Sequence, residues 1–110
     1  MISKEVKIGK GNFIARNVSV NPLAVINNFC ILNTGCIVEH ECVIEDFAHI
    51  APGAVLAGNV TVGKRTFVGA NSVVKHGVVI GDDVVIGAVT VVINDVSSGK
   101  KIVGNPSREI

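Results

Sequence analysis

A medium-sized aliphatic residue returns at every sixth position for fifteen successive repeats. An α-helix repeats every 3.6 residues and a single strand every two, so neither gives a strict period of six. A coil with three short strands per turn does, because one aliphatic side chain then points inward on each side of a triangular prism. The pattern predicts an all-β fold, a parallel β-helix of hexapeptides with about five turns and no long insertions. The repeated positions are Ile8, Ile14, Val20, Ile26, Leu32, Val38, Ile44, Ile50, Leu56, Val62, Val68, Val74, Ile80, Ile86 and Val92.

The other places of each hexad divide into inward and outward positions when the aliphatic residue is counted as the first place. The fifth place holds small side chains and is predicted to point inward. The second place, rich in Gly and Asn, is expected to carry the left-handed backbone of the corners. The sixth place is predicted to point outward, yet most of its residues are apolar, as at Phe13, Ile31, Phe67, Val73 and Val85. Apolar flanks are a liability on a monomer, so we expect a homotrimer closed by three equivalent interfaces.

Three cysteines, Cys30, Cys36 and Cys42, lie six residues apart, which could suggest a metal or redox site. All three fall in the fifth place of their hexads, where Ala, Val, Ser and Thr stand elsewhere. A buried thiol fills such a small inward slot well, so we interpret the cysteines as packing residues.

Composition and charge narrow the function. The chain is 48% hydrophobic with four Phe and no Trp or Tyr, as a narrow prism requires, and its net charge of +1 with no large basic cluster argues against nucleic-acid binding. No apolar run is long enough to span a membrane, and the N-terminus lacks the apolar core of a signal peptide, so a cytoplasmic location is expected.

We predict one domain: a lead-in at 1–7, the β-helix at 8–97 and a C-terminal tail at 98–110, where the repeat phase is broken.

Two histidines are candidates for chemistry at the corners of the prism. His40 and His76 are 36 residues apart, which is two full turns, so they are predicted to lie in one vertical column. Gly58 lies between them and leaves room beside the His40 ring. An imidazole in a cleft is a good general base, and a neighbouring carboxylate such as Glu41 or Glu39 could orient it. The alternative is that His40 is a solvated corner residue and Glu41 only surface charge.

The stretch NTGCIVEHECVIEDFAHIAPGAVLAGNVTV (33–62) resembles the hexapeptide-repeat sugar acetyltransferases. The closest type is the sialic acid O-acetyltransferase group, with the UDP-4-amino-sugar N-acetyltransferases of bacillosamine and perosamine synthesis. VGANSVV (68–74), VVIGAVTVV (84–92) and VGNPSREI (103–110) are also similar to that family. The resemblance implies a left-handed coil, acetyl-CoA as co-substrate, no metal, and a sugar or sugar nucleotide as acetyl acceptor.

The resemblance also implies roles for individual residues. His40 matches the family's catalytic base, and Glu41 matches the acidic residue after it, which is usually Asp. His49 matches a second histidine that contacts acetyl-CoA, while Asn33 matches an Asn near the acceptor. Ala70 and Ala88 match turn positions that line the CoA channel through their backbone groups. The tail sequence Gly104-Asn105-Pro106 matches a motif near the adenine end of CoA.

The family commonly carries an N-terminal α/β domain that holds the sugar nucleotide, whereas this chain starts almost directly in the repeats. A fragment, a natural short form and one part of a split enzyme would each explain the difference. Two other functions remain as alternatives. One is a non-catalytic trimeric β-helix module. The other is a zinc enzyme of the γ-carbonic anhydrase type, for which His40 and His76 have the right interval but Gly81 stands where the third histidine is needed.

Overall fold

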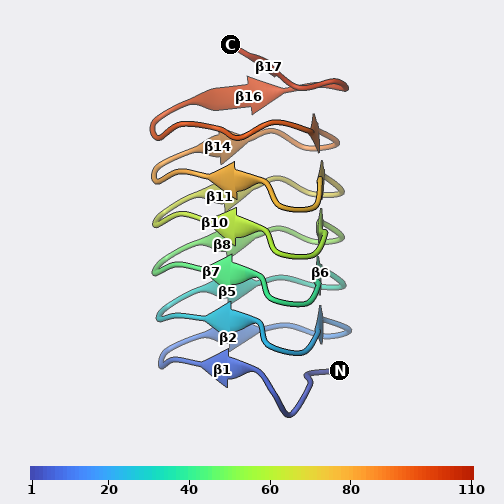
Figure 1. Ribbon diagram of the computed structural model, residues 1–110, viewed down its shortest axis with the longest axis vertical. Coiled ribbons are helices and arrows are strands. Elements are labelled where there is room, and N and C mark those ends of the chain that lie inside the picture. Colours follow the sequence, from blue (N-terminus) through green and yellow to red (C-terminus); the bar gives the residue numbers. More distant parts are fainter.

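The computed structural model describes all 110 residues and contains strands and turns without any helix. The chain winds into a coil in which every turn contributes one short strand to each of three parallel sheets (Figure 1). The near strands in Figure 1 point to the left as the chain climbs from the N-terminus to the C-terminus, so the coil is left-handed. The predicted parallel β-helix is confirmed.

The three sheets follow one another around the coil. The first sheet contains β1 (Lys7–Ile8), β4 (Val25–Ile26), β7 (Val43–Ile44), β10 (Thr61–Val62) and β13 (Val79–Ile80). The second sheet contains β2 (Phe13–Ile14), β5 (Ile31–Leu32), β8 (His49–Ile50), β11 (Phe67–Val68), β14 (Val85–Ile86), β16 (Lys101–Val103) and β17 (Arg108–Glu109). The third sheet contains β3 (Ser19–Val20), β6 (Ile37–Val38), β9 (Val55–Leu56), β12 (Val73–Val74) and β15 (Val91–Val92).

The core is built from the first and fifth places of the hexads. Every first-place aliphatic residue from Val20 to Val92 is completely buried, and the fifth-place residues beside them are buried as well. A fifth-place hydroxyl or thiol also donates to a second-place carbonyl fifteen residues further along: Thr66 Oγ1 to Gly81 O at 2.6 Å, Ser72 Oγ to Gly87 O at 2.9 Å, and Cys42 Sγ to Ala57 O at 3.2 Å. The packing role of Cys30 and Cys42 therefore includes a weak hydrogen bond, and all three cysteines are free thiols.

The prediction for the corner backbone was wrong by two places. Positive φ angles fall at the fourth place of the hexad, for example at Asn17, Phe47 and Val89, and not at the second. Glycine occurs at the second place because successive turns stack closely there, and not because of the backbone conformation. A Cβ at Gly63 would meet backbone atoms of Gly81 one turn above, so glycine here permits close stacking of successive turns.

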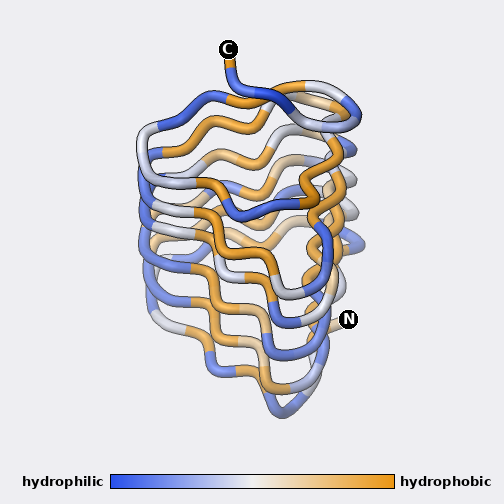
Figure 2. The backbone as a smooth tube through the Cα atoms, turned by 45° about the horizontal axis from the view of Figure 1, so that its top comes forward, coloured by the Kyte–Doolittle hydropathy of each residue, from blue (hydrophilic) through white to orange (hydrophobic).

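The outward direction of the sixth place is confirmed. Side chains such as Phe13, Val79 and Val85 are between 43% and 58% exposed. Figure 2 shows apolar segments along the flat sides of the coil and polar segments mainly at its bends. At the start, Ile2 forms a parallel bridge with Val20, which keeps the 18-residue turn. Only the C-terminal end departs from it: the last turn spans 16 residues, because Ile102 pairs with Ile86. After β16 the chain reverses, and β17 pairs antiparallel with it.

Candidate functional site

His40 and Glu41 form the two-residue corner between β6 of the third sheet and β7 of the first. The corner is held by the turns on either side of it. Glu41 N donates to Pro22 O at 3.1 Å below, and Asn59 N donates to His40 O at 2.9 Å above. Glu41 has a φ of 62°, a left-handed conformation that a non-glycine residue adopts only at some cost. The stacked turns therefore fix the backbone from which both side chains extend.

The two side chains interact with each other. His40 Nδ1 lies 3.2 Å from Glu41 Oε1, and both side chains are about half exposed, at 52% and 57%. A carboxylate only accepts, so the proton of the neutral imidazole belongs on Nδ1, and Nε2 carries the free lone pair. Glu39 is not the partner, because Asn21 Nδ2 donates to its carboxylate from the turn below at 3.1 Å. The arrangement matches that of a general base oriented by a carboxylate.

His76 lies above His40, as the 36-residue spacing predicted, with the ring centroids 6.1 Å apart and the planes tilted by 47°. Gly58 separates them. A Cβ added at Gly58 would meet Nε2 of His40 and would lie 2.6 Å from its Cε1. The missing side chain of Gly58 is thus the reason that the imidazole can lie where it does.

His49 projects outward from β8, where its register partners in the second sheet are Ile31 and Phe67. Its ring meets the Phe67 ring edge to face, with centroids 5.0 Å apart. Partial burial lowers the pKa of His49, because a charged imidazolium loses solvation there. Asn33 Nδ2 lies 3.4 Å from His49 Nε2, so the structure brings these two predicted residues together.

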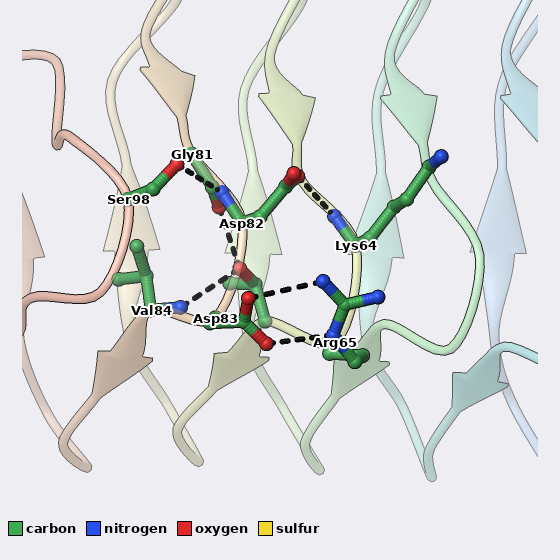
Figure 3. Close-up of polar contacts among 8 residues, drawn as sticks. Lys64, Arg65, Gly81, Asp82, Asp83, Val84 and Ser98 are labelled. Atoms are coloured by element: carbon green, nitrogen blue, oxygen red, sulfur yellow. Dashed lines mark hydrogen bonds and ion pairs between the residues drawn. The ribbon is translucent and has the colours of Figure 1, made fainter.

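Ala70 and Ala88 occupy equivalent places on successive turns, at the corner between the second and third sheets. Val89 N donates to Ala70 O at 2.8 Å, but the N–H groups of Ala70 and Ala88 donate to no atom of the chain. The corner between the first and second sheets differs (Figure 3). There the equivalent N–H of Lys64 donates to Asp82 Oδ1 at 2.7 Å, and that of Asp82 donates to Ser98 Oγ at 2.9 Å.

Figure 3 also shows the outer pair of that corner, in which Arg65 Nε and Nη2 donate to the two Asp83 oxygens at 2.7 and 3.0 Å. The backbone N–H groups of that corner therefore already have hydrogen-bond acceptors in its own side chains. The corner at Ala70 and Ala88 has short side chains and unused backbone donors, which suits it to a ligand with acceptor oxygens.

The predicted site residues form two groups on one chain. His40 and Glu41 lie at the corner between the third and first sheets, whereas Asn33, His49, Ala70 and Ala88 lie on the second sheet or the corner that follows it. In a three-sided coil the second sheet is opposite the first of these corners. One chain therefore does not bring the two groups together, and a cleft that contains both requires two copies of the chain.

Other possible sites are few. A shallow pocket at the C-terminal end is lined by Asn94, Asp95, Val96, Lys100, Ile102, Ser107, Arg108 and Glu109. It contains neither histidine group. No three His, Cys, Asp or Glu side chains are grouped so that they could hold a metal ion, and there is no helix that could cross a membrane.

Two contacts near the site were not predicted from the sequence. Thr34 N donates to Asn33 Oδ1 at 2.8 Å, and Asn21 engages Glu39. The second has a signal in the sequence, because Asn21 and Glu39 are one 18-residue turn apart. The first depends on the orientation of an amide and has no such signal.

The fold and its repeats define a hexapeptide-repeat β-helix protein. Residues 41–76 and 59–94 match the family described as bacterial transferase hexapeptide (six repeats). Over these residues the chain carries the repeats of this family. By sequence comparison it matches none of the curated proteins.

Three solved structures are similar over essentially the whole chain. The acetyltransferase domain of PglB from Neisseria gonorrhoeae FA1090, in complex with acetyl coenzyme A, is 30% identical with a TM-score of 0.98, covering 99% of this chain and 53% of that one. A variant of GDP-perosamine N-acetyltransferase from Caulobacter crescentus, in complex with CoA and GDP-perosamine, is 34% identical with a TM-score of 0.99, covering 100% and 52%. WeeI from Acinetobacter baumannii AYE is 32% identical with a TM-score of 0.96, covering 99% and 54%. The chain thus spans about half the length of each of these structures.

Proposed function

We propose that this chain is the catalytic β-helix of an acetyl-CoA-dependent acetyltransferase that acts on a sugar or sugar nucleotide. The observation that carries the proposal is the His40–Glu41 pair, at 3.2 Å, on a coil that superimposes closely on two acetyltransferases. One of these holds acetyl coenzyme A, and the other holds CoA and a sugar nucleotide.

His40 acts as the general base in the proposed reaction. Its Nε2 takes a proton from the acceptor amine or hydroxyl as that group attacks the thioester carbonyl carbon. The new C–N or C–O bond forms, the C–S bond breaks, and the imidazolium returns the proton to the CoA thiolate. Glu41 stabilises the imidazolium through Nδ1–H. A positioned base contributes about 10²–10⁴ in rate, and alignment of the two substrates up to about 7–11 kcal/mol.

The acetyl-CoA half of the site would come from the second sheet of a neighbouring copy. His49 contacts the acetyl group there, the free N–H groups of Ala70 and Ala88 bind the pantetheine arm, and Asn33 lies near the acceptor. Two features support this assembly: the two residue groups lie on opposite parts of one chain, and the flanks are apolar. A homotrimer would have a mass of three times 11.4 kDa, or about 34 kDa, measurable by light scattering.

Replacement of His40 by Ala tests the base. We expect turnover to fall by about 10²–10⁴, with unchanged folding and unchanged binding of acetyl-CoA. The matched control is Asn94→Ala. Asn94 lies in the same corner column as His40, three turns above it, and its replacement should keep full activity. Wild-type turnover by the His40→Ala protein would exclude this assignment.

A thermal-shift titration separates the enzyme from the non-catalytic module. At 100 times its dissociation constant, acetyl-CoA should stabilise an enzyme by about 2.7 kcal/mol, whereas a scaffold should not respond.

The acceptor is then sought by mass spectrometry with sialic acids and 4-amino-sugar nucleotides. We favour the amino-sugar nucleotides, and hence N-acetylation, because GDP-perosamine is bound in one of the similar structures. The buried free thiols fit the cytoplasmic location that we also propose.

A further inference from the structure

Two imidazoles border the same gap in the corner column between the third and first sheets. His40, Gly58 and His76 follow one another at intervals of 18 residues, so Gly58 is the middle residue of the three. A Cβ at Gly58 would meet Nε2 of His40, which shows that this nitrogen points toward the turn above, over the glycine. The His76 ring borders the gap from above, with its centroid 6.1 Å from that of His40.

The nitrogen that faces the gap has a free lone pair. Glu41 accepts from Nδ1 of His40 at 3.2 Å, so the neutral ring carries its proton there and not on Nε2. His76 is exposed and its ring makes no hydrogen bond within the chain, so one of its nitrogens can turn to the same gap. Imidazole lone pairs are ligands for divalent transition metals, and a carboxylate on the opposite nitrogen is the usual outer partner of a metal-bound histidine.

The separation of the two rings suits a single ion. With Zn–N bonds of about 2.0–2.1 Å, two imidazoles on one ion have centroids between roughly 5 Å apart, at a tetrahedral angle, and roughly 6.4 Å apart, in a straight line. The distance of 6.1 Å between the two centroids lies within this range. Gly58 adds no side chain to the space between the rings, whereas Pro22 and Asn94 stand at the equivalent places of other turns.

We propose that His40 and His76 form a two-histidine site for a divalent transition metal such as Zn²⁺, in which the ion binds the Nε2 lone pair of His40. Binding is a ligand exchange: each imidazole nitrogen replaces one water of the hydrated ion, no electron is transferred, and the neutral rings release no proton. Structural zinc sites have four protein ligands and catalytic ones three, so a pair of histidines with water in the other positions binds the ion reversibly. No third metal-ligating side chain is grouped with the pair.

A metal ion in this site is an inhibitor. The lone pair that it occupies is the one that takes the proton of the acceptor in the proposed reaction, so the zinc-bound chain has no base. This consequence rests on the proposed function, whereas the site itself rests only on the contacts of the chain.

Calorimetric titration of the full chain with zinc chloride tests the site, at a pH above the ordinary titration range of histidine. We expect one ion per chain. His76→Gln removes one ligand and should weaken binding by at least about tenfold, since even the loss of an outer partner costs about 10–100-fold. The control His49→Gln changes a histidine of the second sheet and should leave zinc binding unchanged. Equal affinity of the wild type and His76→Gln would overturn the proposal.

Gly58→Ala distinguishes a shared ion from two imidazoles that bind zinc independently. The variant keeps both histidines but fills the gap with a Cβ, so its affinity for zinc should fall as that of His76→Gln does. Long-range ¹H–¹⁵N nuclear magnetic resonance spectra should show shifts of the His40 and His76 rings with zinc and none of the His49 ring. A Gly58→Ala protein that bound zinc as tightly as the wild type would show that the rings do not share an ion.

Acetyl transfer gives the second readout. Acetylation of a 4-amino-sugar nucleotide is followed by mass spectrometry at early times, because the thiol of released CoA also binds zinc. Each rate is divided by the metal-free rate of the same variant, and half-inhibition of His76→Gln should need at least about ten times more zinc than that of the wild type. A wild-type rate that zinc left unchanged or raised would refute the inhibition. If no transfer occurs without zinc, the proposed function fails, while calorimetry still decides the site.

Discussion

The replacement of Gly58 by Ala should abolish the proposed acetyl transfer without unfolding the chain. The backbone of Gly58 does not have a positive φ, so alanine fits its conformation, and its only close obstacle is the His40 ring. An added Cβ would meet Nε2 and lie 2.6 Å from Cε1 and 3.1 Å from Cδ2 of that ring. The imidazole must therefore turn away, while Glu41 and the backbone of the corner stay in place.

The expected loss follows from the value of a positioned base. Displacing His40 should lower kcat/KM by about 10²–10⁴. At 1.36 kcal/mol per tenfold change, this raises the barrier by about 3–5 kcal/mol. Stability should stay equal or rise, since a compatible Gly→Ala change restricts the unfolded chain and adds about 0.4–1 kcal/mol.

The assay follows CoA release with a thiol reagent and unfolding with urea. The double variant His40→Ala/Gly58→Ala should be no slower than His40→Ala alone, because both changes act on the same group. Acetyl-CoA should stabilise the Gly58→Ala protein and the wild type to the same extent. A folded Gly58→Ala protein with wild-type kcat/KM would show that the position of the His40 ring does not matter for the reaction.

Three further predictions concern the core and the titratable groups. Leu56→Ala, at a completely buried first-place position, should lower the free energy of unfolding by about 2–5 kcal/mol in a urea titration. None of the three thiols should react with Ellman's reagent in the native protein, because burial raises their pKa values, that of Cys36 to about 11. All three should react in urea. A fast-reacting thiol in the native protein would contradict the inward packing. Since burial lowers the pKa of His49 in the folded state, its contribution to stability is complete above the ordinary value near 6.5 and is lost as the pH falls below it. His49→Phe, which copies Phe67 of the same column, should therefore show a smaller fall in stability from neutral to acidic pH; an unchanged fall would exclude His49 as its source.

The period of six was sufficient to predict the sheets and the core, because in a coil with three strands per turn it directs every first-place side chain into the interior. It also placed His76 above His40, since two whole turns separate them. The corner backbone could not be deduced in the same way. Glycine at Gly63 indicates close approach of the next turn, whereas Phe47 adopts the left-handed conformation despite its side chain.

The candidate site was predictable only as far as it lies in vertical columns. The contact of His40 with Glu41 follows from their adjacency. The contact of Asn33 with His49 depends on Thr34, which fixes the amide, and no period encodes an amide orientation. The division of the site between two parts of the coil also follows from the period, because His49 comes half a turn after His40 and so lies on a different side of the prism.

The reversal of the chain after β16 has a consequence for assembly. A stack of parallel strands leaves unpaired N–H and C=O groups at its ends, and another copy could add there and continue the stack as a fibre. At the C-terminal end, β17 runs the opposite way and occupies the outer side of β16, so the second sheet offers an incoming copy no parallel strand to extend. Removal of the last residues, 106–110, would expose that edge and should favour end-to-end polymers.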